Sequence, residues 1–303
     1  MEQNSVITRC STWHYVLDLR KLSQFLLRKN VRQLAPAGVH GVIRLSNVEE
    51  YIKVHRRVLV TGASAGAGRA IATRFAQEGH NLLIVARRIE ELESLKTELE
   101  SKYGIDVVCV SCDLARAEEV ESLYETSRGI GVDVLINNAG LGDWNYVWDV
   151  GLDKLNAMID LNARALAVLS TLFVRDKKDT DACLINVTSL AGYSIFGASV
   201  PYSATKFFAT AFTEGLILDL KSVGSPMQVK VMTPGPIDTE FTAISLSETK
   251  LQGLDASEVK FHSAKEIADF TYELYTSDKP VGIVNLATMT LELRDVIHPS
   301  GSL

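Results

Sequence analysis

Three features that would mark a special class of protein are absent from or scarce in this sequence of 303 residues. It has no run of about 18 or more uncharged apolar residues, which argues against a membrane-spanning helix. Its formal net charge of -6 gives no support to nucleic-acid binding. Its six histidines are isolated along the chain, so no metal site is predicted. With 47% hydrophobic and 22% charged residues, the composition is that of an ordinary globular protein.

Cysteine is also scarce, and four scattered residues do not make a disulfide framework. Cys109 and Cys112 form a CxxC pair, a spacing known from redox and zinc sites. The surrounding run, however, predicts a strand, in which residues three apart point to opposite faces of the sheet. The two thiols then cannot share a ligand, and no second CxxC or histidine pair completes a site. We interpret both as reduced, semi-buried thiols.

Charge is distributed unevenly between the start of the chain and the rest. Residues 1–57 carry ten Lys/Arg and four Asp/Glu, whereas the remaining residues carry 21 and 33. We therefore divide the chain into a basic N-terminal extension, residues 1–55, and an acidic main domain, residues 56–303.

The extension is predicted to be partly helical, because apolar residues recur there at helical spacing among basic ones: Val16, Leu19, Leu22, Phe25 and Leu26. Three roles are open for residues 10–35. They dock on the main domain or a partner subunit, lie on a membrane surface, or form an organelle-targeting presequence. Glu2 and Asp18 argue against the third role. Since the segment lacks the continuous apolar core of a secretory signal, we expect a cytoplasmic protein, with organelle targeting and membrane association left open.

From residue 56 onward, apolar runs alternate with amphipathic stretches, which predicts a parallel sheet with helices on both faces. The expected strands are 57–61, 81–86, 105–111, 132–136, 182–188, 228–233 and 281–286. The first expected helix ends near residue 79. The others cover about 89–103, 117–127, 152–174, 202–221 and 264–276. Residues 236–263 are expected to form a polar loop with one short helix.

A glycine-rich turn follows the first expected strand, with the sequence TGASAGAG from Thr61 to Gly68. Gly62, Gly66 and Gly68 lack a Cβ, so the backbone can turn tightly there and let a ligand approach. At a junction between strand and helix, this arrangement brings a pyrophosphate to the helix N-terminus. The turn therefore predicts a dinucleotide site.

Further patterns follow in order along the chain: Asp113-Leu114, the NNAG run 137–140, Asn162, Ser189 thirteen positions before Tyr202, Lys206 four after it, and the PGxxxT run 234–239. Together with the spacing TGxxxGxG, these patterns resemble the motifs of the short-chain dehydrogenase/reductase family. The resemblance covers about residues 56–287. The resemblance implies a single α/β, Rossmann-type doubly wound domain with about seven parallel strands flanked by helices. It also implies a nicotinamide cofactor and a small-molecule carbonyl or alcohol substrate.

The chemistry of the tyrosine can be argued from its neighbours. Tyr202 and Lys206 share one face of the expected helix, and an ammonium beside a phenol favours the phenolate, so the pKa of Tyr202 is expected to fall. Tyr202 would then exchange a proton with the substrate oxygen, and Ser189 would hydrogen-bond that oxygen. The resemblance implies that Lys206 holds the nicotinamide ribose and that Asn162 positions a water behind it. We expect Asn162, Ser189, Tyr202 and Lys206 to be the catalytic residues.

The end of the second expected strand bears on the choice of cofactor. An acidic residue there would bind the adenosine ribose and repel a 2′-phosphate, but the chain has Ala86 followed by Arg87 and Arg88. Arginine suits phosphate, and Ser64 adds a hydroxyl, so NADP(H) is expected over NAD(H). The other interpretation of the two arginines is a solvated helix start. The residues expected to bind cofactor are Gly62, Ser64, Gly66, Ala67, Gly68, Arg87, Arg88, Asp113, Leu114, Asn138, Ala139, Gly140, Tyr202, Lys206, Pro234, Gly235, Ile237 and Thr239.

The sequence does not identify the substrate. Six large side chains are expected at the substrate mouth or, alternatively, in loop packing: Trp144, Tyr146, Trp148, Tyr193, Ile195 and Phe196. The resemblance implies a homo-oligomer built on residues 152–174 and 202–221. We expect an NADP(H)-dependent oxidoreductase that uses Tyr202 as general acid and base. The alternative is a non-catalytic dinucleotide-binding regulatory or scaffold protein.

Overall fold

The computed structural model describes residues 55–247, 249–250, 259–299 and 301, which contain the main domain. The amphipathic helix predicted within residues 10–35 lies outside the described residues.

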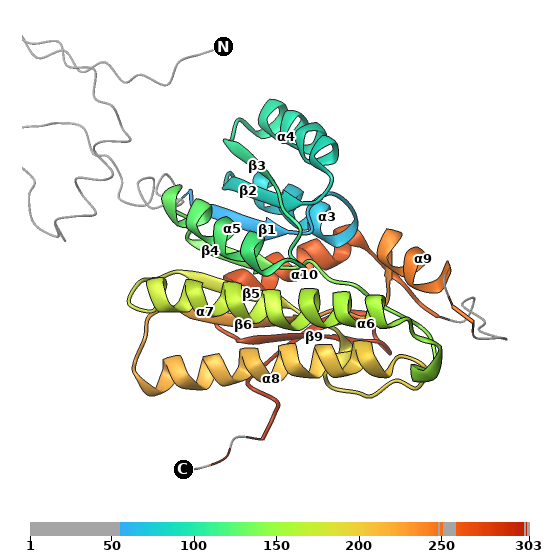
Figure 1. Cartoon of the computed structure of the whole chain (residues 1–303). Helices are drawn as coiled ribbons and strands as arrows, with labels where there is room; N and C mark the ends of the chain where they lie inside the picture. Colours follow the sequence, from blue (N-terminus) through green and yellow to red (C-terminus); the bar gives the residue numbers. More distant parts are fainter. Residues whose placement is uncertain (1–54, 248, 251–258, 300, 302–303) are drawn as a thin grey trace, which may run out of the picture. The chain divides into compact units, whose positions relative to one another are not determined.

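The main domain is built on an eight-stranded sheet in the order β10-β9-β6-β5-β4-β1-β2-β3 (Figure 1). Seven strands are parallel and β10 runs antiparallel to β9, so the predicted doubly wound α/β fold is confirmed. The strands are β1 Arg57–Thr61, β2 Asn81–Ala86, β3 Val107–Ser111, β4 Val134–Asn137, β5 Cys183–Val187, β6 Gln228–Thr233, β9 Val281–Asn285 and β10 Thr290–Arg294. The chain order reverses between β1 and β4, and ligands of such sheets bind beyond the carboxyl ends of the strands at that point.

Helices cover both faces of the sheet (Figure 1). α3, α4 and α10 pack on one face, and α5, α7 and α8 pack on the other. The helices are α3 Gly66–Gln77, α4 Ile89–Tyr103, α5 Ala117–Gly129, α6 Leu152–Ile159, α7 Leu166–Lys177, α8 Val200–Ser222, α9 Glu240–Ser247 and α10 Ala264–Thr276. Short 3-10 turns, η1 Val147–Asp149 and η3 Leu190–Gly192, complete the loops near the carboxyl edge.

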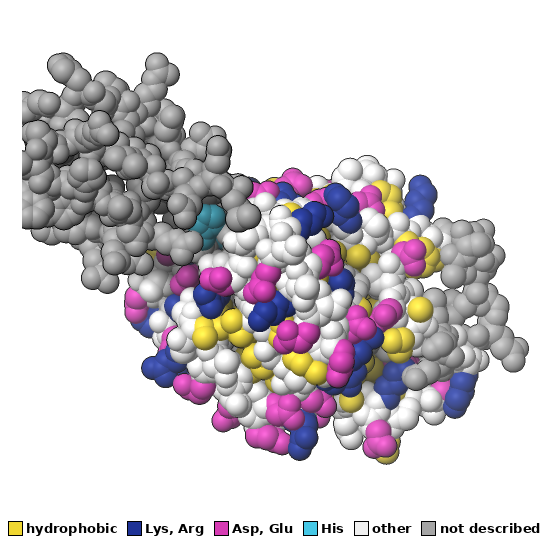
Figure 2. All heavy atoms as spheres, turned by 90° about the horizontal axis from the view of Figure 1, so that it is seen from above, with side chains coloured by type: hydrophobic (Ala, Val, Ile, Leu, Met, Phe, Trp, Pro, Cys, Tyr) yellow, Lys and Arg dark blue, Asp and Glu magenta, His cyan; other side chains and the backbone are white. Residues whose placement is uncertain are grey.

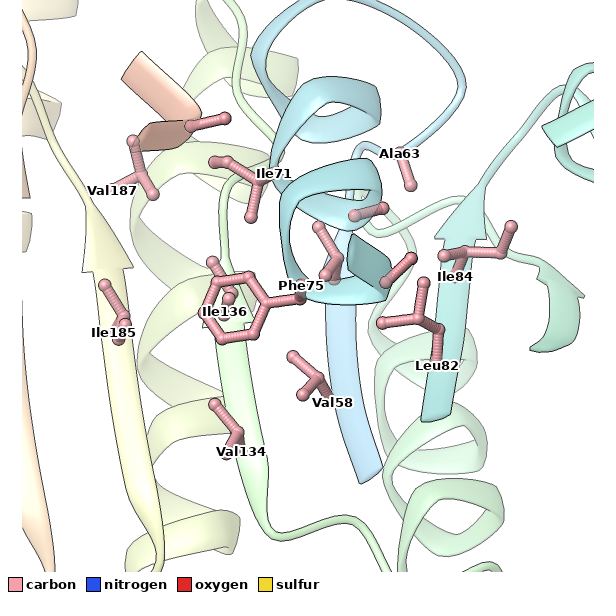
Figure 3. Packing of buried hydrophobic residues seen from close by; sticks show 14 of the residues in the cluster. Val58, Ala63, Ile71, Phe75, Leu82, Ile84, Val134, Ile136, Ile185 and Val187 are labelled. Carbon is pink, nitrogen blue, oxygen red and sulfur yellow. The ribbon is translucent and has the colours of Figure 1, made fainter. Parts of the chain in front are cut away.

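The core on the α3 side shows why these strands are continuous apolar runs. Phe75 and Ile71 of α3 lie over Val58 of β1 and Ile136 of β4, and all four side chains are fully buried (Figure 3). Burial of one such side chain contributes about 1.5–3 kcal/mol. Leu59 lies between the two valines of β1 that face α3, and its own side chain packs into the core on the opposite face of the sheet. Both faces of the sheet are therefore covered, as in other parallel sheets.

The two thiols of the CxxC pair lie on opposite faces, as predicted. Cys109 packs against the core on the α3 side, whereas Cys112 belongs to the core on the α5 side. Burial raises the pKa of Cys109 to about 11 and that of Cys112 to about 12. Both thiols are free, and because they lie on opposite faces of the sheet they form no disulfide with each other.

The structure adds three features that the sequence pattern did not predict. β10 extends the sheet past the expected last strand, and the chain reaches it through Met289, whose φ is 58°. A two-stranded ribbon, β7 Ile237–Asp238 with β8 His262–Ser263, lies within the region expected to be a loop. The long helix expected over 152–174 is interrupted by a π-helical segment, η2 Asp160–Ala165.

Acidic and basic side chains are interspersed over the face of the domain shown in Figure 2. Ion pairs join neighbouring helices, such as Arg69 of α3 with Glu98 of α4 at 2.9 Å and Arg74 of α3 with Asp269 of α10 at 3.1 Å. Such half-exposed pairs contribute up to about 1 kcal/mol each. The helices are therefore held mainly by the apolar core beneath them.

Candidate active site

A cavity of about 1210 Å³ opens at the carboxyl edge of the sheet, beside the point where the strand order reverses. Every residue expected to bind the cofactor lines it, from the glycine turn at one end to the loop 234–239 at the other. Ser189 also lines it, whereas Asn162 lies behind its wall. The structure thus brings together segments that are far apart in the sequence.

The glycine turn is shaped for close approach of a ligand. Gly62 and Gly66 have φ values of 69° and 54°, in the left-handed region that favours glycine. Gly68 is required for another reason, because a Cβ there would lie 2.2 Å from the Gly62 carbonyl oxygen. α3 begins at Gly66, so its first backbone N–H groups lack partners within the helix and face the cavity. They provide an anion site suited to a pyrophosphate.

Thr61, whose role the motif analysis missed, joins the glycine turn to the NNAG run. Its hydroxyl accepts hydrogen bonds from the backbone N–H groups of Asn138 and Ala139, at 2.9 and 3.0 Å. The Asn138 side chain returns a hydrogen bond to the Thr61 carbonyl oxygen at 3.0 Å. A hydroxyl residue directly before the turn was the signal that could have indicated this link.

Tyr202 and Lys206 lie on α8 and reach the cavity beside Ser189, which follows β5. The Ser189 hydroxyl hydrogen-bonds the Tyr202 phenol, and its oxygen accepts the N–H of Ala191 at 3.1 Å. The ammonium of Lys206 lies 5.7 Å from the centre of the Tyr202 ring and donates to the Val187 carbonyl at 3.3 Å. The three predicted side chains are therefore grouped as a proton-transfer site requires.

The pKa of Tyr202 is shifted in the direction opposite to the one expected. Burial raises it to about 12, although the hydrogen bond from Ser189 acts to lower it. Desolvation outweighs this hydrogen bond because the ring is 9% exposed and lies against Phe241, 6.0 Å away between ring centres. The protonated phenol is thereby favoured, which is the form that can donate a proton.

Asn162 supports the site from behind. It lies in the π-helical segment η2, a form of helix frequent at functional sites. Its side chain accepts the N–H of Leu141 at 2.8 Å, donates to the Leu141 carbonyl at 2.7 Å and donates to the Thr205 hydroxyl at 3.1 Å. Gly140 leaves room beside it, since a Cβ there would lie 3.3 Å from Asn162 and 3.6 Å from the Lys206 ammonium. In this structure Asn162 fixes the loop after β4, and its expected water-positioning role stays a prediction.

Of the two arginines expected to bind the cofactor phosphate, Arg88 is the one that contacts Ser64. Its guanidinium donates to the Ser64 hydroxyl at 3.2 Å and forms an ion pair with Glu240 at 3.0 Å. Arg87 also lines the cavity, with its side chain exposed to solvent. Arg88 and Ser64 together could hold a phosphate monoester.

The six large side chains expected at the substrate mouth divide into those that line the cavity and those that do not. Trp144 and Phe196 line the cavity, whereas Ile195 is 78% exposed and Tyr193 hydrogen-bonds the buried Glu214. Tyr146 and Trp148 stack on each other and are exposed to solvent. The cavity is completed by apolar residues that the sequence analysis did not identify: Leu141, Phe241, Ile244, Val259, Phe261 and Leu286.

Replacement of Lys206 with Met is expected to stabilise the fold while abolishing turnover. Burial lowers the pKa of Lys206 to about 8, so between about pH 8 and pH 10.5 the unfolded chain binds more protons than the native one. The free energy of unfolding therefore rises with pH in that window, and at about pH 7 the buried cation still destabilises the fold. Lys206→Met should raise the free energy of unfolding there by about 1–3 kcal/mol.

Urea denaturation of both proteins at about pH 7 and about pH 10 measures this effect. The gain should shrink at the higher pH, where the amine is mostly neutral. A variant that is less stable than the parent at both pH values would contradict the assigned cost of burying the cation.

Comparison with known proteins agrees with this geometry. A family model described as short chain dehydrogenase matches residues 56–250. Dehydrogenase/reductase SDR family member 11 of Gallus gallus is 34% identical over 194 residues, which cover 61% of this chain and 76% of that protein. A short-chain dehydrogenase from Sphingobium yanoikuyae, solved in complex with NADPH, is 28% identical with a TM-score of 0.67, over 75% of this chain and 87% of the other.

A second solved structure shows the fold alone. It is a short chain dehydrogenase/reductase from Burkholderia phymatum in complex with NAD, 21% identical with a TM-score of 0.65. The alignment covers 73% of this chain and 85% of the other.

Proposed function

The chain belongs to the short-chain dehydrogenase/reductase family, whose members are oxidoreductases that act on alcohol or carbonyl groups with a nicotinamide cofactor, and from this premise we propose that it uses NADP(H). The reaction is transfer of a hydride between NADP(H) and a carbonyl or secondary-alcohol carbon. One observation carries the proposal: Ser189, Tyr202 and Lys206 share a single cavity with the glycine turn.

The residues of the chain divide the work between binding and proton transfer. The bound cofactor supplies or accepts the hydride. The N–H groups at the start of α3, which have no partner within the helix, would hold its pyrophosphate. In the reductive direction Tyr202 donates its proton to the substrate oxygen, and Ser189 hydrogen-bonds the same oxygen as negative charge develops. The ammonium of Lys206 stabilises the phenolate that remains.

The end of β2 supports NADP(H) over NAD(H). The last residue of β2 is Ala86, so the strand does not end in the acidic residue that would bind the adenosine ribose and favour NAD(H). Arg88 and Ser64 lie next to this position and supply the charge and the hydroxyl that a phosphate requires. The NADPH complex of the Sphingobium yanoikuyae relative supports the same choice.

Replacement of Arg88 with Gln tests the choice of cofactor. Loss of charge-assisted hydrogen bonds to the 2′-phosphate should weaken NADPH binding about tenfold or more and leave NADH binding nearly unchanged. Arg87→Gln is the matched control, and we expect a smaller effect because the contact with Ser64 belongs to Arg88. Intrinsic fluorescence, titrated with each dinucleotide, measures the affinities. Equal losses of NADPH and NADH affinity in Arg88→Gln would refute the assignment.

The lining of the substrate end supports an apolar carbonyl or alcohol as substrate. Trp144, Phe196 and Phe241 face this part of the cavity. Lys154, which also lines the cavity, is paired with the buried carboxylate of Asp143 at 2.7 Å. Its charge is therefore already balanced without an anionic substrate. A panel of ketones and aldehydes of increasing polarity tests this class, and a preference for anionic substrates would exclude it.

Two further proposals concern assembly and location. Leu152 on α6 and Phe208 on α8 are 74% and 44% exposed, and we propose that they meet a second copy of the chain. The segment Leu152–Lys177 is long and apolar enough to cross a membrane. Its second half, α7, packs Leu169 and Phe173 into the core, which supports a helix covered by protein rather than by lipid. Sedimentation of a monomer would exclude the homo-oligomer. The expected cytoplasmic location and the role of residues 1–55 stay predictions.

A further inference from the structure

The guanidinium of Arg88, which is expected to bind the cofactor phosphate, is already paired with a carboxylate of the chain itself. Glu240 lies 3.0 Å from the guanidinium of Arg88, which also donates to Ser64 at 3.2 Å. All three residues line the cavity. A phosphate monoester bound between Arg88 and Ser64 would therefore come close to Glu240, and two anions would compete for one guanidinium.

Glu240 belongs to a different part of the fold from its partner. It begins α9, whereas Arg88 immediately precedes α4. The next residue of α9, Phe241, fills the space beside Gly142, where a Cβ would lie 2.7 Å from its ring, and faces Tyr202. The ion pair thus links the end of β2 to the wall beside the tyrosine.

The pair is weak enough to be exchanged. The side chains of Arg88 and Glu240 are 51% and 57% exposed, and ion pairs of this kind are well screened by water. A phosphate monoester carries nearly two negative charges and three acceptor oxygens, so it is the stronger ligand for a guanidinium and a hydroxyl.

We propose that Glu240 is a specificity-determining residue that competes with the 2′-phosphate of NADP(H) for Arg88. Binding of NADP(H) exchanges the ion pair for a guanidinium–phosphate pair and releases the first turn of α9, whereas NAD(H) leaves the ion pair in place. This inference rests on the proposed function.

Glu240→Gln and the matched control Glu91→Gln test the inference in the full chain. Glu91 is a half-exposed acid of α4 that lies 3.9 Å from Arg69, so its replacement removes the same charge near the site without touching Arg88. Fluorescence titration should show NADPH binding about two- to fivefold tighter in Glu240→Gln, the range expected for loss of one exposed competing pair. NADH affinity should not change, and Glu91→Gln should bind both cofactors as the parent does.

Hydrogen exchange of the amides of residues 241–245 provides the second measurement. In the parent these amides should exchange faster in the NADPH complex than in the NADH complex, and in Glu240→Gln the two complexes should exchange alike. Thermal unfolding checks that Glu240→Gln is folded. If Glu240→Gln is not folded, Glu240→Ala is used in its place. If the parent binds NADPH and Glu240→Gln binds it equally or more weakly, the inference fails and the proposed function stands. If the parent binds neither dinucleotide, both fail.

Discussion

Replacing Tyr202 with Phe is expected to lower turnover about a hundredfold or more while NADPH binding is retained. The hydroxyl is the group that donates the proton, and phenylalanine removes it without changing the ring that packs against Phe241. Ser189 and Lys206 remain in place, so the cofactor cavity keeps its shape. Steady-state rates with an apolar carbonyl substrate, measured beside a fluorescence titration with NADPH, separate loss of chemistry from loss of binding.

Tyr193→Phe is the matched control for this substitution. Tyr193 follows Ser189 by four positions, but its hydroxyl donates to Glu214 instead of facing the cavity. Its removal should change turnover less than about tenfold, because no proton passes through it. If Tyr202→Phe keeps the parent rate, Tyr202 is not the proton donor. If the two variants lose activity equally, the effect is one of packing.

Gly68→Ala should weaken both the fold and the cofactor site. The added Cβ would lie 2.2 Å from the Gly62 carbonyl oxygen and 2.5 Å from the Asn138 side chain, and backbone must move to relieve the first contact. Overpacking of this kind costs about 1–3 kcal/mol in the free energy of unfolding. Because the glycine turn must shift, NADPH affinity should fall about tenfold or more. Urea denaturation and a fluorescence titration measure the two effects.

Gly129→Ala controls for the general effect of replacing a glycine. Gly129 ends α5, is exposed and has no atom within 4 Å of where a Cβ would stand. Its replacement should change the free energy of unfolding by no more than about 0.5 kcal/mol and leave NADPH affinity unaltered. A Gly68→Ala protein with the stability and affinity of the parent would refute the close-approach interpretation of the glycine turn.

The sequence pattern predicts most of this fold because buried parallel strands are continuous apolar runs with helices between them. β2 and β6 were predicted with the same ends that the structure has, because each apolar run is bounded by residues that do not continue it. β10 was missed because it lacks the continuous apolar run of the parallel strands, although alternation such as that of Thr290-Leu291-Glu292 is itself typical of a half-buried strand. The π-helical segment around Asn162 was also missed, since a change of hydrogen-bond register leaves no mark in apolar spacing.

The sequence predicted which residues form the site but not which of their side chains contact one another. Two adjacent arginines cannot be told apart until the start of α4 is known, and it is Arg88, in extended conformation just before α4, that turns toward Ser64. The sequence shows Lys206 near Tyr202, yet the depth of burial decides the pKa of the tyrosine. Phe241 reaches Tyr202 from 39 positions along the chain, a contact that only the tertiary fold creates.

Loss of NADPH absorbance in the presence of apolar ketones and aldehydes tests the central claim most directly. The purified full chain should oxidise NADPH with at least one of these compounds, faster than it oxidises NADH, and yield the corresponding alcohol. If the chain binds NADPH but consumes it with no carbonyl compound, and forms none from alcohols with NADP, it is not a catalyst of this reaction. The non-catalytic dinucleotide-binding protein would then be the better account of the same cavity.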